Sequence, residues 1–149
     1  MIQDNENARK YFLMIQDIIK RMAQNSFMLK GWSLTIYSVV IAFNLANLQW
    51  VFFLNAIIII GFFWVLDSYY LRQERLFRKL WEKKVDLFNN DREELNKNLF
   101  DMDTKKIQSS LEDKQKVKNI FGVMFSTTEC LFYLPIEVIS IIFMIVHLT

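Results

Sequence analysis

Charged residues are absent from two long stretches of the chain. No Asp, Glu, Lys or Arg occurs between Lys30 and Asp67, a run of 36 residues, and after Glu129 only Glu137 interrupts the apolar sequence. A helix crosses a hydrocarbon core with roughly 20 residues, so the first run is long enough for two spans. The pattern predicts transmembrane helices at 31–47 and 50–66, joined by a tight turn at 46–50, and a third at 126–149.

Helical periodicity continues on both sides of the first apolar run. In 9–30 and in 67–88, apolar side chains recur on one face of a helix. These residues are Tyr11, Ile15, Ile18 and Met22 in the first arm, and Tyr70, Phe77, Trp81 and Phe88 in the second. We expect two continuous helices of about 40 residues, each about 60 Å long and lying half in lipid and half in cytoplasm. Reflection of the chain about the turn brings Lys30 opposite Asp67, which predicts an ion pair at the membrane boundary.

The segment 89–125 is polar and breaks the helical pattern. Asn89 and Asn90 are expected to end the second arm, and Asp91 to cap a short helix at 92–100. Asp103 and Thr104 are expected to cap a further helix that runs to about Asn119. The few packing residues of this segment are Phe100, Ile107, Leu111 and Val117. We interpret the segment as a cytoplasmic sensor or partner surface.

Composition agrees with an all-helical membrane protein. Three Gly and one Pro in 149 residues favour long helices over a loop-rich β fold. We therefore expect an all-α integral membrane protein: an antiparallel two-span hairpin that extends into the cytoplasm (1–30 and 67–88), short cytoplasmic helices at 89–125, and a third transmembrane helix. Two spans with a buried or interfacial third helix is the alternative architecture.

The basic residues predict the orientation in the membrane. Residues 1–30 hold five Lys and Arg, 67–126 hold the other thirteen, and the turn and the C-terminus hold none. The positive-inside rule therefore places the N-terminus and the central segment in the cytoplasm and the C-terminus outside. Trp32, Trp50 and Trp64 fall near the expected interfaces, where tryptophans commonly anchor membrane helices.

Enzymatic chemistry is not expected. The chain has one Cys, Cys130, and one His, His147, so it cannot form an intramolecular disulfide, a Cys-based metal cluster or a histidine metal site. The sequence also gives no combination of a nucleophile with a general base that would indicate catalysis. We expect no catalytic residues, no metal and no cofactor.

Polar residues inside the spans are the candidates for lining a pore, because such groups avoid lipid. They are Glu137, Ser140, Asn44, Asn55, Thr35 and Ser38. Thr35 and Ser38 also continue a small-residue stripe from Gly31, so close helix packing is the alternative for them. Hydrogen bonds between helices are the alternative for the asparagines. Glu137 predicts either an acidic ring in an oligomer or a neutral carboxyl bonded to a neighbouring helix.

A basic stripe marks the second cytoplasmic arm. It consists of Arg72, Arg75, Lys79 and Lys83. These side chains are candidates for binding the phosphates of a signal, and anionic lipid headgroups are the alternative ligand. Ser126 and Glu129 form a capping signature at the start of the third span, where Glu129 is interpreted as a cap.

Several strings resemble a known group of proteins. They are Met22-Ala-Gln-Asn-Ser-Phe-Met-Leu-Lys-Gly-Trp32, Phe63-Trp-Val-Leu-Asp-Ser-Tyr-Tyr-Leu-Arg-Gln-Glu-Arg-Leu-Phe-Arg78 and Met124-Phe-Ser-Thr-Thr-Glu-Cys-Leu-Phe-Tyr133. The chain resembles the SLATT-type small membrane effectors of bacterial antiphage defence systems linked to nucleotidyltransferases, and is also similar to the channel subunit of the Hailong system, whose signal is an oligonucleotide. The resemblance covers both arms and the last helix but not 89–120.

The resemblance implies an oligomeric pore in the bacterial inner membrane that arrests the infected cell. Its expected partners are the lipid bilayer, further copies of the chain (a tetramer is our working number) and a nucleotide or oligonucleotide signal from a nucleotidyltransferase. One three-span protomer cannot enclose an aqueous path, so a pore requires several copies. The alternative function is a membrane-anchored scaffold or sensor subunit that recruits a cytoplasmic partner without conducting ions.

Overall fold

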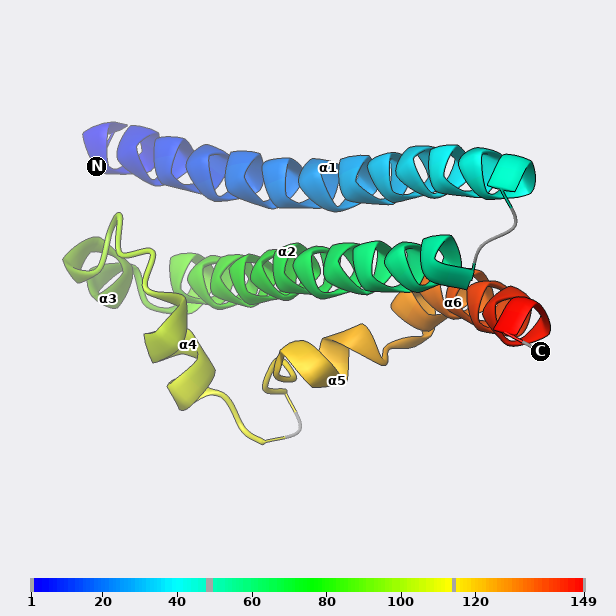
Figure 1. Ribbon diagram of the computed structural model, residues 1–149. Coiled ribbons are helices and arrows are strands. Elements are labelled where there is room, and N and C mark those ends of the chain that lie inside the picture. The colour runs from blue at the N-terminus through cyan, green and yellow to red at the C-terminus, as the bar shows by residue number, and fades with distance from the viewer. Residues whose placement is uncertain (1, 48–49, 114, 149) are drawn as a thin grey trace. The chain divides into compact units, whose positions relative to one another are not determined.

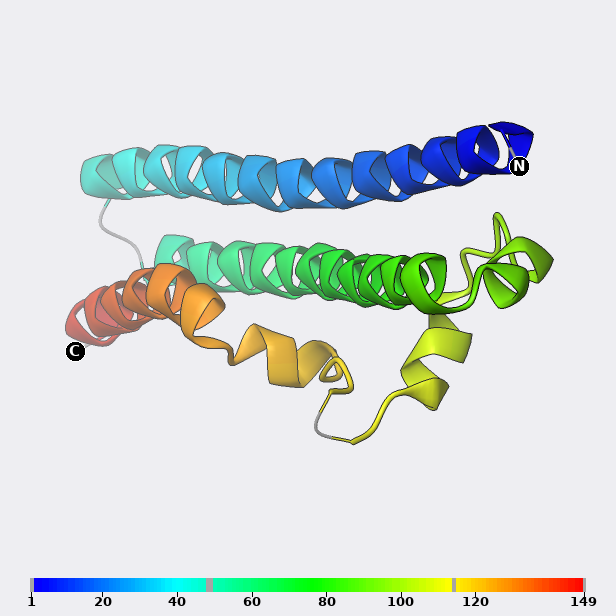
Figure 2. The ribbon, with the colours of Figure 1, turned by 180° about the vertical axis from the view of Figure 1, so that it is seen from behind.

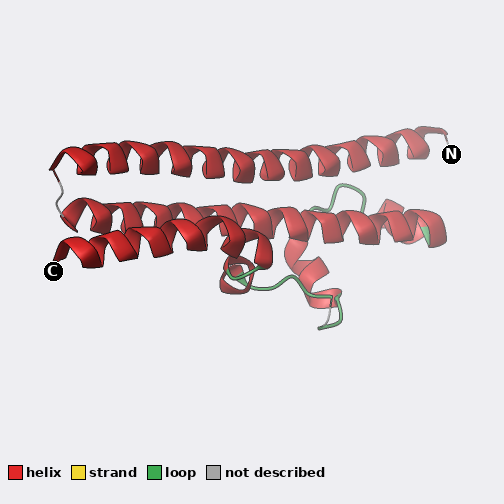
Figure 3. Ribbon diagram, turned by 90° about the vertical axis from the view of Figure 1, so that its right-hand side faces the viewer, coloured by secondary structure: helices red, strands yellow, loops and turns green. Residues whose placement is uncertain are grey.

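The computed structural model describes residues 2–47, 50–113 and 115–148, and the side chains of 5–43, 50–113 and 115–147. All regular elements in these ranges are helices and no strand occurs among them (Figures 1 and 3). The helices are α1 (Ile2–Asn47), α2 (Trp50–Asn90), α3 (Arg92–Lys97), α4 (Thr104–Ser110), α5 (Ile120–Met124) and α6 (Thr127–Leu148). Three of them, α1, α2 and α6, are long and apolar enough to cross a membrane. The expected turn at 46–50 includes Leu48 and Gln49, which lie outside the described residues.

The two long helices run without interruption through apolar and polar sequence. Helix α1 has 46 residues and α2 has 41, close to the expected 40 for each. Both remain helical in the ribbon seen from either side (Figure 2). Helix α2 ends at Asn90, as expected from Asn89 and Asn90. The break comes at Asp91, whose carboxylate accepts the backbone N–H of Glu94 at 3.0 Å and caps α3.

The two short helices that follow are shorter than expected. Helix α3 ends at Lys97, and its C-cap Asn98 donates its backbone N–H to the carbonyls of Glu94 and Leu95. Phe100, two residues later, takes a left-handed backbone conformation with φ of 66°. Helix α4 starts after its cap, Asp103, as expected, but ends at Ser110 and not near Asn119. Beyond it, the side chain of Gln108 bonds both the N–H and the carbonyl of Val117. This amide takes the place of helical hydrogen bonds and stabilises an irregular segment.

The chain divides into two compact units, 1–24 with 72–117 (unit 1) and 25–71 with 118–149 (unit 2). In unit 1, the buried core consists of Tyr11, Ile15, Leu80 and Ile107. The Tyr11 hydroxyl donates to the carbonyl of Asp101 at 2.6 Å. The buried face of α2 in this unit is centred on Leu76 and Leu80, whereas Phe77 and Trp81, expected at its centre, are only partly buried.

Unit 2 has its own core, which joins α2 to α6. Ile60, Trp64 and Tyr133 are buried together, and the rings of Trp64 and Tyr133 stack with centroids 5.7 Å apart. The indole of Trp64 donates to the carbonyl of Met124 at 3.1 Å. Trp64 is therefore a core residue and not the interfacial anchor that its position in the sequence suggested. Trp32 and Trp50 are exposed, as interfacial residues are.

Candidate functional site

A buried charge cluster joins α1, α2 and α6 within unit 2. Lys30 in α1 forms the expected ion pair with Asp67 in α2, and its Nζ also lies 2.9 Å from Oε1 of Glu129 in α6. The Tyr133 hydroxyl donates to Oδ2 of Asp67 at 3.0 Å, and Ser26 Oγ lies 3.3 Å from the ammonium group. One lysine thus connects three helices through two carboxylates.

The cluster contains more acid than base. Asp67 and Glu129 are both fully buried, while the Lys30 side chain retains 20% of its exposure. Oδ1 of Asp67 and Oε2 of Glu129 have no hydrogen-bond partner among the described residues. Removal of a charge from water is costly unless it is paired, so Lys30 is the group that makes this arrangement stable.

Sequence reasoning identified only half of this cluster. Glu129, interpreted as a cap of the third span, instead directs its carboxylate at Lys30, 99 positions earlier in the chain. Tyr133 was not singled out at all. A signal existed, because an acidic residue and a tyrosine one helical turn apart beside an apolar run share a helix face. The partner across the helices, however, is not encoded in that spacing.

Glu137 lies in α6, and its side chain is partly exposed. Its Oε1 approaches Gly61 of α2, where a Cβ atom would stand 3.7 Å away. Its side chain is half-buried, and no ion pair is formed with it in the described part of the chain. A partly exposed carboxyl group in the middle of an apolar helix is unfavourable in contact with lipid. We therefore expect the Glu137 carboxyl to face water or polar groups.

The remaining pore-lining candidates divide into exposed and buried residues. Thr35, Ser38 and Asn55 are exposed, so the small-residue stripe in α1 does not pack within the chain. The hydroxyls of Thr35 and Ser38 bond carbonyls four residues earlier, at 3.0 Å and 2.8 Å. Each hydroxyl is therefore satisfied by its own helix. Asn44 is helical in its backbone, but its side chain lies outside the described residues.

Ser140 is a correction to the candidates for pore lining. It is fully buried, with Oγ 2.8 Å from the carbonyl of Ile136 and 3.1 Å from the hydroxyl of Tyr37 in α1. A hydroxyl enclosed between helices of the same chain cannot face a pore. Ser140 serves instead as a polar contact between α6 and α1.

The members of the basic stripe of α2 differ in their contacts. Lys79 pairs with Glu82 at 2.7 Å, and Lys83 bonds the hydroxyl of Ser110 at 2.8 Å. Arg72 and Arg75 each have interactions of their own. Arg72 lines a cavity of about 430 Å³ within unit 1.

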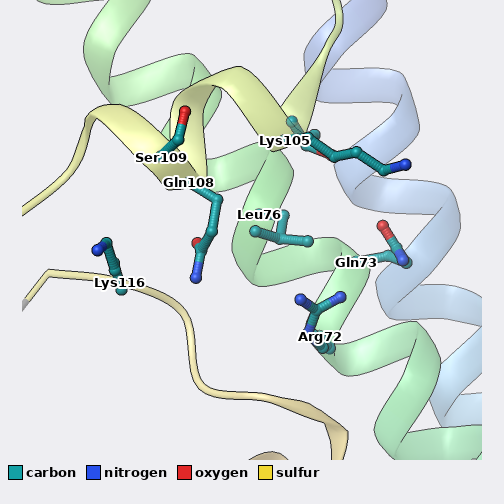
Figure 4. A pocket seen from close by; sticks show the side chains of 8 residues that line it. Arg72, Gln73, Leu76, Lys105, Gln108, Ser109 and Lys116 are labelled. Atoms are coloured by element: carbon teal, nitrogen blue, oxygen red, sulfur yellow. The ribbon is translucent and has the colours of Figure 1, made fainter. Parts of the chain in front are cut away.

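That cavity includes residues that the sequence did not suggest. Its side chains come from α2, α4 and the segment that follows α4 (Figure 4). They are Arg72, Gln73, Leu76, Thr104, Lys105, Gln108, Ser109 and Lys116. Three of them are basic and none is acidic. The acidic groups of the polar segment lie outside the lining. One of them, Asp101, accepts the N–H of Asp103 and pairs with Lys106, and both contacts lower the pKa of its carboxyl.

Metal chemistry finds no support in the described residues, where no group of three or more His, Cys, Asp or Glu is placed to hold an ion. Comparison with known proteins finds no matching family model, no similar curated protein and no similar solved structure. Function therefore has to be argued from the charge cluster, Glu137 and the cavity.

Proposed function

We propose that the chain forms a homo-oligomeric ion channel in the bacterial inner membrane, gated through its cytoplasmic helices by a nucleotide or oligonucleotide signal. The protomer inserts as an antiparallel hairpin of α1 and α2 with α6 as a third span, its N-terminus in the cytoplasm and its C-terminus outside. The effector role in antiphage defence follows from the resemblance of its strings to such proteins.

Contacts within each unit support the hairpin. In unit 2, Lys30 pairs with Asp67, and in unit 1 the rings of Phe12 and Phe88 lie 5.7 Å apart. The two members of each pair are nearly equidistant in sequence from residues 48 and 49. Two antiparallel helices joined at that point produce this pattern, because each step away from the turn is matched on the other arm.

The position of Glu137 is the observation that most supports a channel. It stands half-buried in an apolar helix beside Gly61, without a cation in the described part of the chain to neutralise it. A lone protomer would present this carboxyl to lipid, at a cost of several kcal/mol. Several copies around an axis would place the carboxyls in a ring at a water-filled path. Rings of carboxylates in pores favour cations.

The surfaces of the three candidate transmembrane helices, α1, α2 and α6, are suited to oligomer assembly. Large apolar side chains are exposed along all three, and they include Phe43, Ile58, Phe62, Leu131, Ile142 and Val146. These residues suit both lipid and helix contacts. The exposed stripe of Gly31, Thr35 and Ser38 permits close approach of a helix from another copy, because small residues let backbones pack tightly.

Cation flux into liposomes tests the channel. We expect wild-type protein to conduct when mono-, di- and trinucleotides, linear and cyclic, are supplied in turn on the cytoplasmic side. Glu137→Gln keeps the shape of the side chain and removes its charge, so the preference for cations over anions should fall. Glu137→Leu should reduce flux by about tenfold or more, because an apolar ring is a barrier to ions.

Controls separate conduction from assembly. Ile141→Leu, a change at an exposed apolar position of the same helix, should leave flux unchanged. Mass measurement in detergent checks that each variant assembles as the wild type does. An oligomer that conducts under no condition would overturn the channel and favour the membrane-anchored scaffold. Equal ion preference in the wild type and Glu137→Gln would remove Glu137 from the pore.

A further inference from the structure

We propose that the cavity of unit 1 is a binding site for the phosphate groups of an anionic ligand, with Arg72, Lys105 and Lys116 as its cationic contacts. These residues come from α2, α4 and the segment after α4, so the site exists only in the folded unit (Figure 4). As the place where the gating signal binds, the site rests on the proposed function. The proposal that the site binds phosphate does not depend on the channel, because binding is measured without conduction.

The charge of the lining selects for anions. Three basic side chains and no carboxylate of the described residues surround the space. The amides of Gln73 and Gln108 and the hydroxyl of Thr104 supply further donors, whereas the hydroxyl of Ser109 donates to the carbonyl of Lys106 at 2.9 Å. An arginine fork and lysine ammonium groups are the side chains that bind phosphate best. By contrast, Lys79 and Lys83 of the original stripe contact Glu82 and Ser110 outside this cavity.

Hydrogen bonds hold the cavity in shape before any ligand arrives. Nε2 of Gln108 donates to the carbonyl of Val117 at 2.7 Å, and Oε1 accepts its N–H at 3.1 Å. This pair of hydrogen bonds connects the segment after α4 to α4 and holds the backbone next to Lys116 in place. Preorganisation of this kind reduces the entropy that binding must offset.

Lys116 remains available to a ligand. Its ammonium group lies 2.7 Å from Asp113, but the two side chains are 39% and 95% exposed. An exposed pair of this kind contributes little free energy, about 0–1 kcal/mol. A phosphate group carries more charge than Asp113 and contacts several donors at once, so it competes effectively for the lysine.

The lining indicates which part of a ligand is recognised. Among the described residues, Leu76 is the only apolar member of the lining, and none of them contributes an aromatic ring that could stack on a nucleobase. A volume of about 430 Å³ lies within the range of small-molecule sites, roughly 300–1,000 Å³. The chemistry therefore favours recognition through two or three phosphates, with any attached group directed toward solvent.

Two kinds of ligand carry phosphate groups that could bind here. One is a soluble polyphosphate or nucleotide. The other is an anionic lipid headgroup, because Arg72 follows Asp67 by only five residues in α2, and Asp67 is the first charge after the apolar run. The experiment distinguishes them with a single probe in two surroundings.

Tripolyphosphate binding to the full-length protein, measured by calorimetry in an uncharged maltoside detergent, is the test. We expect saturable binding that weakens at high salt. Lys105→Gln with Lys116→Gln should reduce the affinity by roughly tenfold to a hundredfold, since two charged contacts to phosphate are lost. The charge-matched control is Lys97→Gln with Lys106→Gln, which changes two lysines of unit 1 outside the cavity and should bind as the wild type does.

The same titration in nanodiscs identifies the source. Undiminished tripolyphosphate affinity in discs that contain phosphatidylglycerol supports the site and assigns it to a soluble ligand. Loss of affinity in those discs but not in pure phosphatidylcholine discs supports the site and assigns it to a lipid headgroup. Absence of binding in maltoside, or equal weakening by the cavity and control variants, overturns the proposal.

Discussion

At the scale of single residues, Lys30 pairs with two buried carboxylates at once. Asp67 and Glu129 both lie against its ammonium group, and each retains one oxygen without a hydrogen-bond partner among the described residues. Tyr133 donates to Asp67 and satisfies part of the remaining demand. A charge cluster with such an excess of acid depends on its cation, because an unpaired buried charge is far less stable than a paired one.

Replacement of Lys30 by Met, which has a similar shape and no charge, should destabilise the protein by about 3–5 kcal/mol. The reason is that Asp67 and Glu129 would face each other without a cation. Neutralisation of both acids in Lys30→Met/Asp67→Asn/Glu129→Gln should recover most of the loss. Unfolding in mixed micelles, followed by circular dichroism, measures the change. Lys20→Met, at an exposed position of α1, is the control and should have little effect.

At the scale of elements, the segment after α4 is stabilised by a side chain and not by a helix. Gln108 bonds both backbone groups of the buried Val117, and α4 ends at Ser110. The sequence favoured a longer helix because residues 111–119 contain neither Gly nor Pro. The tertiary contact has the larger effect, since a buried backbone group must find a partner and an amide side chain supplies two bonds at once.

Gln108→Ala should loosen this segment without unfolding the protein. Loss of the two bonds leaves polar groups of Val117 unpaired, at a cost of about 1–3 kcal/mol. Amide hydrogen exchange of 111–117 should accelerate by about tenfold or more, while α3 is unchanged. Gln108→Glu retains the acceptor but not the donor and should lie between the two. Wild-type exchange in Gln108→Ala would show that the bonds do not stabilise the segment.

At the scale of the whole molecule, three helices are long and apolar enough to span a membrane. The basic residues are confined to 9–30 and 72–118, outside the apolar stretches of these helices. An odd number of spans places the two ends of the chain on opposite sides of the bilayer. Thirteen basic residues in 67–126 strongly favour the cytoplasm for the segment between the second and third spans.

Cysteine labelling in intact spheroplasts tests this topology. In a Cys130→Ser background, which removes the native thiol, we expect Thr149→Cys to react with a membrane-impermeant maleimide from outside. Lys97→Cys should react only after the membrane is opened, because the proposed topology places α3 in the cytoplasm. Labelling of both positions in intact cells, or of neither, would contradict an arrangement with three spans.

The sequence by itself determined the helical composition, the three apolar helices, the caps at Asp91 and Asp103 and the pairing of Lys30 with Asp67. These features follow from local signals, namely hydropathy over a helix length, short-range capping and symmetry about a turn. Only the tertiary structure decided that Glu129 joins the charge cluster, that Ser140 is buried, and which basic residues share a cavity. Such groupings depend on how each helix is rotated about its axis and on where an irregular segment returns. Residue spacing along one helix does not specify either, because helices far apart in sequence meet through packing of whole faces.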